Sequence, residues 1–186
     1  MRRLIPLCVL LVAAVARAAA PGELDVDTRS STLTYHLVHK MHEVDGVSHQ
    51  VTGKARLLPD GRAQVMIRVP AQSFDSGNVN RDAHMKEAVD AARYPTIELK
   101  ALGDGVTVPA SFPSTAKKTF KAQLAFHGVE QVMQVPVELT WESPTRIRAA
   151  ATLTISLDAF KVERPSLMFI KVDDALKIDA KLVFRR

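Results

Sequence analysis

Apolar and polar residues alternate along most of the chain beyond residue 31. Residues 62–69, RAQVMIRV, illustrate the pattern. One face of an extended segment carries Ala63, Val65, Ile67 and Val69. The opposite face is polar except for Met66. A period of two is typical of a strand with one buried and one solvated face. The pattern predicts strands at residues 32–41, 49–57, 62–69, 96–101, 120–126, 135–141, 146–157 and 176–184.

Turn residues separate several of these segments, as in Pro59-Asp60-Gly61 and His127-Gly128. Strands joined by short turns are expected to pair antiparallel, which predicts an all-β fold. An eight-stranded antiparallel barrel would leave no exposed sheet edge, and a two-sheet sandwich is the competing arrangement. Periodicity alone does not separate the two.

Small residues are frequent on the predicted inward faces. An eight-stranded barrel is just wide enough to be filled by side chains or to hold one small ligand. Small lining residues favour a ligand cavity, and close packing against larger residues opposite is the alternative. The small inward residues are Gly53, Ala55, Ala63, Ala101, Ala122, Ala149, Ala151 and Ala180.

One helix is predicted between the strands, at about residues 80–93. Asn80 is a suitable N-cap, and Asp82 lies in the first turn, where the helix dipole favours a carboxylate. Pro95 should end the helix near Arg93. We expect the helix to cover one mouth of the barrel, or to plug that end as ordinary core. Its apolar stripe consists of Met85, Ala88, Val89 and Ala92.

The first twenty residues, MRRLIPLCVLLVAAVARAAA, have the form of a secretory signal peptide. A basic start precedes an apolar run over residues 4–16, which is too short to anchor the chain in a membrane. Cleavage is expected after Ala18 or Ala20, which leaves residues 21–186 as one domain. Cys8 lies inside the apolar run, so a lipoprotein is not expected. The sequence therefore predicts a periplasmic or secreted protein.

Removal of this segment changes the charge and the cysteine count. Loss of Arg2, Arg3 and Arg17 lowers the basic residues from 25 to 22 against 20 acidic residues, a net charge of about +2. That balance does not suggest a nucleic-acid-binding protein. Cys8 is the single cysteine, so the exported domain must fold without a disulfide.

Several motifs resemble the YceI-like family of secreted bacterial proteins. The stretch SGNVNRDAHMKEAVDAARYPTIEL, residues 76–99, carries a small-Gly-Asn turn, an Arg-Asp pair, a His followed by an apolar residue, an acidic residue and Tyr-Pro. The stretches LTYHLVH, VTGKA and LAFHGVEQVMQVPVEL resemble other parts of the family pattern in the same order. The resemblance runs from about residue 24 to the C-terminus. The sequence departs from the pattern at Val89 and Ala55, where the family usually has aromatic residues, and in the long connection MHEVDGVSH.

The resemblance implies a lipocalin-like barrel with one helix at its mouth and a long apolar cavity. Members of the family resemble proteins that bind polyisoprenoids, isoprenoid quinones and other long-chain amphiphiles. The family has no recognised catalytic machinery. No cofactor is expected beyond a bound lipid.

Three histidines in HLVHKMH raise the question of a metal site. On a helix His36, His39 and His42 would share one face, but the family resemblance makes this segment a strand. Leu33, Tyr35, Leu37, His39 and Met41 then face inward, while His36 and His42 face outward. A weaker metal hypothesis remains, in which His42 and His49 approach across a hairpin with Glu43 or Asp45 nearby. A solvated turn rich in histidine is the alternative.

Other chemistry has little support in the sequence. Nucleophile-elbow, phosphate-loop and dinucleotide-binding motifs are absent. Ser76, Asp82 and His84 are close in sequence but have no evident oxyanion hole, so an enzyme is not expected. An outward basic patch that contacts anionic lipid, or an ordinary solvated exterior, would be formed by Arg62, Arg68, Arg146 and Arg148.

The sequence as a whole predicts an exported binding protein for one long apolar molecule. A metal-binding protein and a filled barrel that acts as an interaction module are the alternatives, and a dimer is compatible with the pattern. The expected cavity lining is Tyr35, Leu37, Val51, Val65, Ile67, Ile97, Leu99, Leu124, Phe126, Val137, Leu153 and Ile155. We expect Met85 and Val89 of the predicted helix to close the barrel mouth like a lid. Phe160, Met168 and Phe169 are expected to flank the entrance to the cavity. His39, Arg81 and His84 are candidates to contact the polar head group.

Overall fold

The computed structural model describes residues 22–39, 42–164, 166–167 and 170–186. The predicted signal peptide, residues 1–20, lies outside the described residues. Most of the described chain is strand. One 10-stranded antiparallel sheet contains β1 (Glu23–Val26), β2 (Thr32–His39), β3 (His42–Ser48), β4 (Thr52–Leu57), β5 (Ala63–Pro70), β6 (Thr96–Gly103), β7 (Ser114–Phe126), β8 (Val129–Ser143), β9 (Arg146–Ser156) and β12 (Ala175–Arg185).

The remaining elements are short. A 2-stranded sheet pairs β10 (Ser166–Leu167) with β11 (Ile170–Lys171). The helices are η1 (Thr28–Ser30), η2 (Ala71–Ser73), α1 (Val79–Ala88) and η3 (Asp158–Phe160). None of the helices in the described part has the length and apolar character needed to cross a bilayer.

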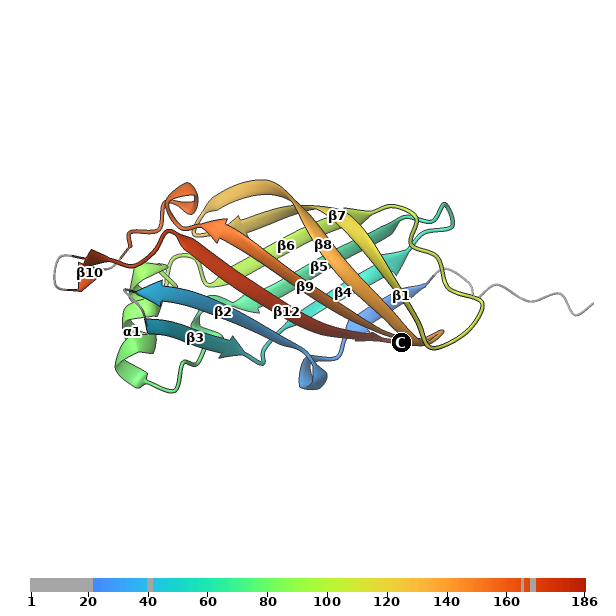
Figure 1. The fold of residues 1–186 in the computed structure, drawn as a ribbon, viewed down its shortest axis with the longest axis horizontal. Coiled ribbons are helices and arrows are strands. Elements are labelled where there is room, and N and C mark those ends of the chain that lie inside the picture. Colours follow the sequence, from blue (N-terminus) through green and yellow to red (C-terminus); the bar gives the residue numbers. More distant parts are fainter. Residues whose placement is uncertain (1–21, 40–41, 165, 168–169) are drawn as a thin grey trace, which may run out of the picture.

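The large sheet closes on itself (Figure 1). Hydrogen-bonded neighbours follow the order β1-β4-β5-β6-β7-β8-β9-β12, and β12 pairs in turn with β1. The closing pairs join Asp25 to Arg185 and Val26 to Phe184. The structure therefore confirms the predicted eight-stranded barrel over the sandwich, since a sandwich would leave sheet edges unpaired.

Strands β2 and β3 extend the wall beyond this ring. β2 continues along β12 where β1 leaves it, with Tyr35 opposite Ile178. β3 then adds to β2 as a hairpin, with Leu37 opposite Val44. The alternation pattern identified β2 but not β1 or β3.

Strand β3 was not predicted because its inward residues are small and do not form an alternating apolar pattern. Its inward positions are Val44, Gly46 and Ser48, and two of these do not read as apolar. Gly46 lies directly opposite Tyr35, and a Cβ atom there would collide with the Tyr35 ring. The segment interpreted as either a metal-binding hairpin or a histidine-rich turn is therefore a strand whose inner face must stay small.

Helix α1 starts earlier and ends earlier than the predicted range of residues 80–93. Asn78 is the N-cap rather than Asn80, and its side chain accepts the backbone N–H groups of Asn80 and Arg81 at 3.1 Å each. The cap is two residues earlier because Asn78 has the extended backbone that an N-cap requires.

The helix ends at Ala88 because the chain reverses there. Asp90 adopts a left-handed conformation with φ of 44°, and the Ala91 N–H reaches back to the Lys86 carbonyl at 2.9 Å. This hydrogen bond satisfies a carbonyl group of the last helical turn. The helix therefore ends before the position near Arg93 at which Pro95 was expected to end it. Ala92, which was predicted to complete the apolar stripe, is consequently exposed beyond the helix.

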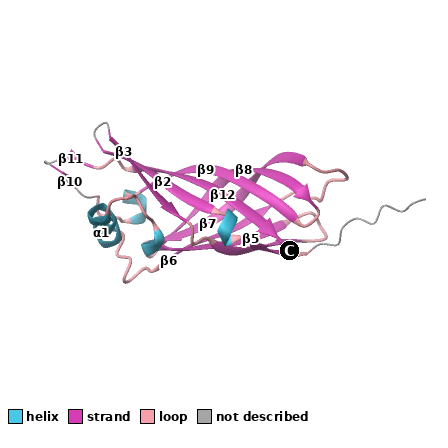
Figure 2. Cartoon of the chain, turned by 90° about the horizontal axis from the view of Figure 1, so that it is seen from below, coloured by secondary structure: helices cyan, strands magenta, loops and turns pink. Residues whose placement is uncertain are grey.

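The two ends of the barrel differ. Figure 2 shows α1 at one end together with β10 and β11, while the long strands run toward the other end. The far end is filled by buried side chains that include Leu24, Val106, Trp141 and Ile147. The barrel is therefore closed by packed side chains at the end that carries the C-terminus. At the other end it is bordered by α1, β10 and β11.

Asp82 ties the start of α1 to the preceding turn. Its carboxylate accepts hydrogen bonds from the hydroxyl of Ser76 and from the Ser76 backbone N–H, the latter at 3.0 Å. The hydrogen bond from the Ser76 hydroxyl is the main cause that holds the pKa of Asp82 below its ordinary value of 3.8.

The substitution Asp82→Asn should lower the free energy of unfolding at neutral pH by about 1–3 kcal/mol, the usual worth of hydrogen bonds to a charged group. A lowered folded-state pKa stabilises the protein above the unfolded-state value, and this contribution is lost as the pH falls through the folded-state pKa. Urea denaturation at neutral pH and at about pH 2 should therefore show a gap between wild type and variant that shrinks in acid. Glu87→Gln, an exposed change on the same helix, is the control. An equal gap at both pH values would contradict this role of the charge.

Candidate functional site

An apolar cavity of about 940 Å³ occupies the barrel between the packed end and α1. Its wall comes from the inward positions of β2, β3, β5 to β9 and β12. Small residues lie side by side on neighbouring strands of this wall, with Ala101 next to Ala122 and Ala151 next to Ala180. These pairs cannot fill the interior, so the barrel is hollow rather than close-packed.

Most of the predicted lining residues border this cavity. They are Tyr35, Leu37, Val65, Ile67, Ile97, Leu99, Leu124, Phe126, Val137, Leu153 and Ile155. Their placement follows from strand alternation alone, since each occupies an inward position of a strand that the pattern identified. Their contact with a ligand stays a prediction.

Val51 and Phe160 do not line the cavity, contrary to the sequence prediction. Val51 is completely buried in the link between β3 and β4, where its carbonyl accepts the Thr28 hydroxyl at 2.9 Å. Phe160 is also buried, because η3 folds it inward against the ring of Phe126 at a centroid distance of 5.6 Å. Both side chains belong to the packed core.

Three predicted contacts cannot be placed. Met168 and Phe169, predicted to flank the entrance, lie outside the described residues. The same holds for the side chain of His39, the proposed head-group contact, although its backbone belongs to β2.

Helix α1 contributes one side of the cavity mouth. Met85, Ala88 and Val89 line the cavity, together with the more exposed Arg81 and His84. Arg81 is held in place from the turn before the helix, since its guanidinium donates to the hydroxyl and carbonyl oxygens of Ser76 at 2.9 and 2.7 Å. The SGN turn and the Arg-Asp pair of the sequence motif thus position the helix over the barrel.

The segment after β9 contributes the opposite side of the mouth. Val162, Glu163, Arg164, Lys171 and Val172 line the cavity there. Arg164 donates to the Asp158 carboxylate at 2.8 and 2.9 Å and to the Val172 carbonyl at 2.9 Å, which ties the two arms of the segment together. The sequence marked this segment by its apolar residues, so its charged contributions to the lining were missed.

Charge in the lining is confined to the mouth. The charged or titratable lining residues on α1 and on the segment after β9 are Arg81, His84, Glu87, Glu163, Arg164 and Lys171. The lining also includes the hydroxyl of Tyr35, and burial is the main cause that raises the pKa of this phenol above its ordinary value. Tyr35 is therefore a neutral group beside Phe74, whose ring centroid lies 5.5 Å away.

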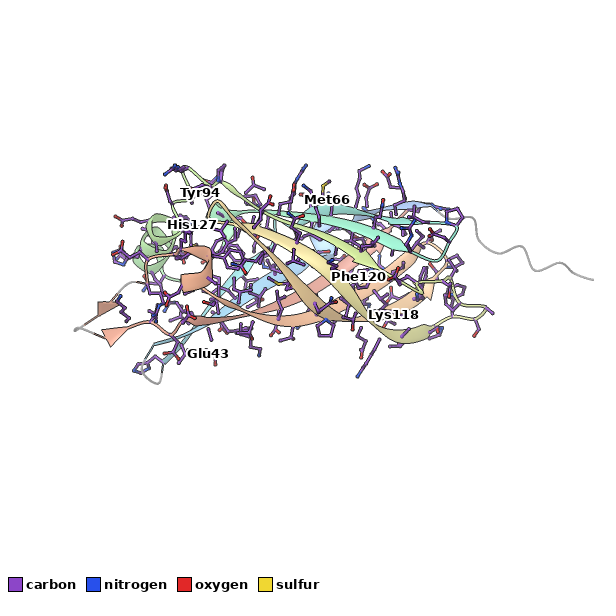
Figure 3. All side chains as sticks on the ribbon, turned by 90° about the horizontal axis from the view of Figure 1, so that it is seen from above. Glu43, Met66, Tyr94, Lys118, Phe120 and His127 are labelled. Atoms are coloured by element: carbon purple, nitrogen blue, oxygen red, sulfur yellow. The ribbon has the colours of Figure 1, made fainter. Side chains whose placement is uncertain are left out.

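Two of the sequence motifs meet beside the mouth. The rings of Tyr94 and His127 pack edge to face with centroids 5.0 Å apart. Figure 3 shows the two residues close together near the α1 end. His127 and Gly128 form the tight turn between β7 and β8 with positive φ at both residues, as that hairpin turn requires. A Cβ atom on Gly128 would press on the Tyr94 ring, and His127 Nδ1 lies 3.0 Å from the Phe160 carbonyl. These contacts fix η3 and the end of the α1 segment against the barrel wall.

The proposed metal pair does not form. His42 begins β3 and His49 follows its last residue, so an extended strand of about 20 Å separates the two side chains. The prediction that they approach across a hairpin is wrong, because the hairpin turn precedes His42 rather than following it.

The catalytic alternative also lacks its geometry. The Ser76 hydroxyl is bonded to Asp82 and Arg81, and no hydrogen bond joins it to His84 among the described residues. A serine needs a hydrogen-bonded general base to act as a nucleophile. Ser76 and Asp82 serve the helix start instead.

The four arginines predicted as an outward basic patch are paired with carboxylates. Arg62 contacts Asp60, Arg68 contacts Glu98, and Arg146 and Arg148 both contact Glu142. The exterior at these positions is therefore an ordinary surface of ion pairs rather than a cationic patch.

Comparisons with known proteins agree with this architecture. The polyisoprenoid-binding domain from Saccharophagus degradans implicated in plant cell wall breakdown has a TM-score of 0.71 at 18% identity, over 87% of this chain and 97% of that chain. BcnA from Burkholderia cenocepacia has a TM-score of 0.68 at 21% identity, over 85% and 98%. The YceI protein of Campylobacter jejuni has a TM-score of 0.61 at 13% identity, over 80% and 88%. A comparison with curated proteins found no match.

The structural neighbours share the fold at low sequence identity. The family described as the YceI-like domain matches residues 24–184, which includes α1 and all of the closed ring except its first and last residues. The chain therefore belongs to the YceI-like family.

Proposed function

We propose that this protein is an exported carrier that holds one long-chain amphiphile in its barrel, with the apolar chain inside and the polar head at the α1 mouth. The observation that carries the proposal is the apolar cavity of about 940 Å³ whose charged lining is confined to one end. A polyisoprenoid, an isoprenoid quinone or another long-chain lipid has this division between a long apolar chain and a small polar head. The name of the Saccharophagus degradans domain, a polyisoprenoid-binding domain, supports the same class of ligand.

Burial of the chain supplies enough free energy for useful affinity. Each buried methylene contributes about 0.8 kcal/mol, so ten of them contribute roughly 8 kcal/mol. A dissociation constant of 1 μM corresponds to about 8.2 kcal/mol, so a longer chain would also cover association costs. Affinity in this account depends on chain length more than on the head group.

The mouth offers the head group charges of both signs. Arg81 and Lys171 are cationic, and Glu87 and Glu163 are anionic. The donors of Arg81 are partly used by Ser76, which fixes the guanidinium at the rim. A neutral or zwitterionic head is compatible with this mixed rim.

The predicted signal peptide fits a carrier that works outside the cytoplasm. Expression of the full chain in a bacterial host should yield an exported protein whose intact mass matches cleavage after Ala18 or Ala20. A periplasmic fraction without the protein, or a mass that retains the first 18 residues, would contradict export by this segment.

A large side chain in the cavity should block the ligand. Leu124 and Gln123 are neighbours on β7, and Leu124 lines the cavity while Gln123 is exposed on the outside. Leu124→Trp should displace about three buried methylenes and weaken binding roughly 50-fold. Titration with cis-parinaric acid, an 18-carbon fluorescent fatty acid, measures this change.

Gln123→Trp is the matched control and should bind the probe as the wild type does. Circular dichroism and thermal unfolding show whether both variants keep the fold. Equal binding by the two folded variants would place the ligand outside the barrel and overturn the proposal. Failure of the wild type to bind any long-chain probe would favour a filled or purely structural barrel.

A further inference from the structure

A second cluster of polar side chains lies on the outer face of β2, β3 and β12. His36 points outward because its neighbours Tyr35 and Leu37 line the cavity. Strand register places Asp45 directly opposite His36 on β3 and Glu43 two residues further along. On the other side, Asp179 of β12 lies two residues from Lys177, the partner of His36.

The imidazole of His36 contacts carboxylates at both ring nitrogens. Nδ1 lies 2.7 Å from Asp45 Oδ1 and 3.6 Å from Glu43 Oε1, and Nε2 lies 2.9 Å from Asp179 Oδ2. The candidate ligand atoms of His36, Glu43 and Asp45 all lie within 4.8 Å of one another. Figure 3 shows Glu43 near the α1 end of the molecule, at the start of β3.

Asp179 is oriented to accept a hydrogen bond from Nε2 of His36. The Thr152 hydroxyl donates to Asp179 Oδ1 at 2.6 Å and orients the carboxylate, whose other oxygen faces Nε2. A neutral imidazole has one N–H, and the tautomer that places it on Nε2 donates it to Asp179. Nδ1 then presents a lone pair to Asp45 and Glu43, which are themselves acceptors. Three acceptors directed at one point are favourable only when a positive charge lies there, either a second ring proton or a bound cation.

We infer that His36, Glu43 and Asp45 form a binding site for a divalent transition metal of the zinc class, with Asp179 as the positioning residue. Imidazole nitrogen and carboxylate oxygen are common zinc ligands, with bonds of about 2.0–2.2 Å. A carboxylate that accepts the second N–H of a ligating histidine is the usual support for such a site. Glu43 and Asp45 have side chains that are 61% and 54% exposed, so both can adjust to a metal and leave a position for water.

A metal at this point would brace the edge of the barrel mouth. β3 pairs with β2 along one side, and on its other side a bridge joins Val47 to Asp75. The same strands direct Leu37 and Val44 into the cavity. The metal would hold β3 to β2, and Asp179 would extend this support to β12. The inference stands apart from the proposed carrier function, because the cluster faces away from the cavity.

Zinc titration of the chelator-treated, signal-free protein tests the inference. Isothermal calorimetry should show one Zn²⁺ per chain with a micromolar dissociation constant, and zinc should raise the unfolding temperature. The double variant Glu43→Gln and Asp45→Asn should weaken binding at least 100-fold. Asp179→Asn should weaken it roughly 10- to 100-fold, as is usual for loss of a supporting carboxylate.

His49→Ala is the control, because His49 is an exposed histidine beyond the other end of β3. It should leave the affinity unchanged. Nitrogen NMR of the His36 ring should show loss of any proton on Nδ1 when zinc is added. Three results would overturn the inference: no saturable binding, equal binding by the folded double variant, or an imidazole that keeps both protons in the presence of zinc. The last result would identify His36 as a charged imidazolium that bridges the carboxylates.

Discussion

Closure of the strand ring is the constraint on which the rest of the structure depends. Each ring strand has a hydrogen-bonded neighbour on both sides, so the wall is held by its own backbone. The wall can therefore carry neighbouring alanines, such as Ala101 beside Ala122 and Ala151 beside Ala180, without large side chains that fill the interior. A two-sheet sandwich is stabilised by the side chains between its sheets and could not keep such a space empty.

The difference between the two ends gives the cavity its direction. Trp141 and the residues around it pack the far end, while α1 and the segment after β9 frame the other end with charged groups. Local contacts hold this frame, namely Ser76 with Arg81 and Asp82 on one side and Tyr94 with His127 on the other. The residues of the family motifs thus hold the structure of the mouth, and none of these contacts forms a catalytic arrangement.

Strand alternation predicted most of the ring and most of the wall residues, because each inward position follows from its neighbours two residues away. The local sequence pattern failed to predict features that depend on tertiary contacts. β3 was hidden because Tyr35 requires glycine opposite it, and the end of α1 depends on the left-handed conformation of Asp90. Phe160 was predicted to flank the entrance, yet η3 places it in the core. The cluster around His36 could not be found from local spacing, since Asp179 is distant in sequence and only strand register brings it close.

The central claim is that the barrel carries a long apolar molecule, and native mass spectrometry of the exported protein tests it most directly. The protein would be purified from bacterial periplasm without detergent, measured intact, and measured again after extraction with organic solvent. The account predicts an additional mass that leaves with the solvent and fragments as an isoprenoid or acyl chain. A protein that shows only its own mass, and that takes up no polyprenol, quinone or fatty acid when these are added, would contradict the account.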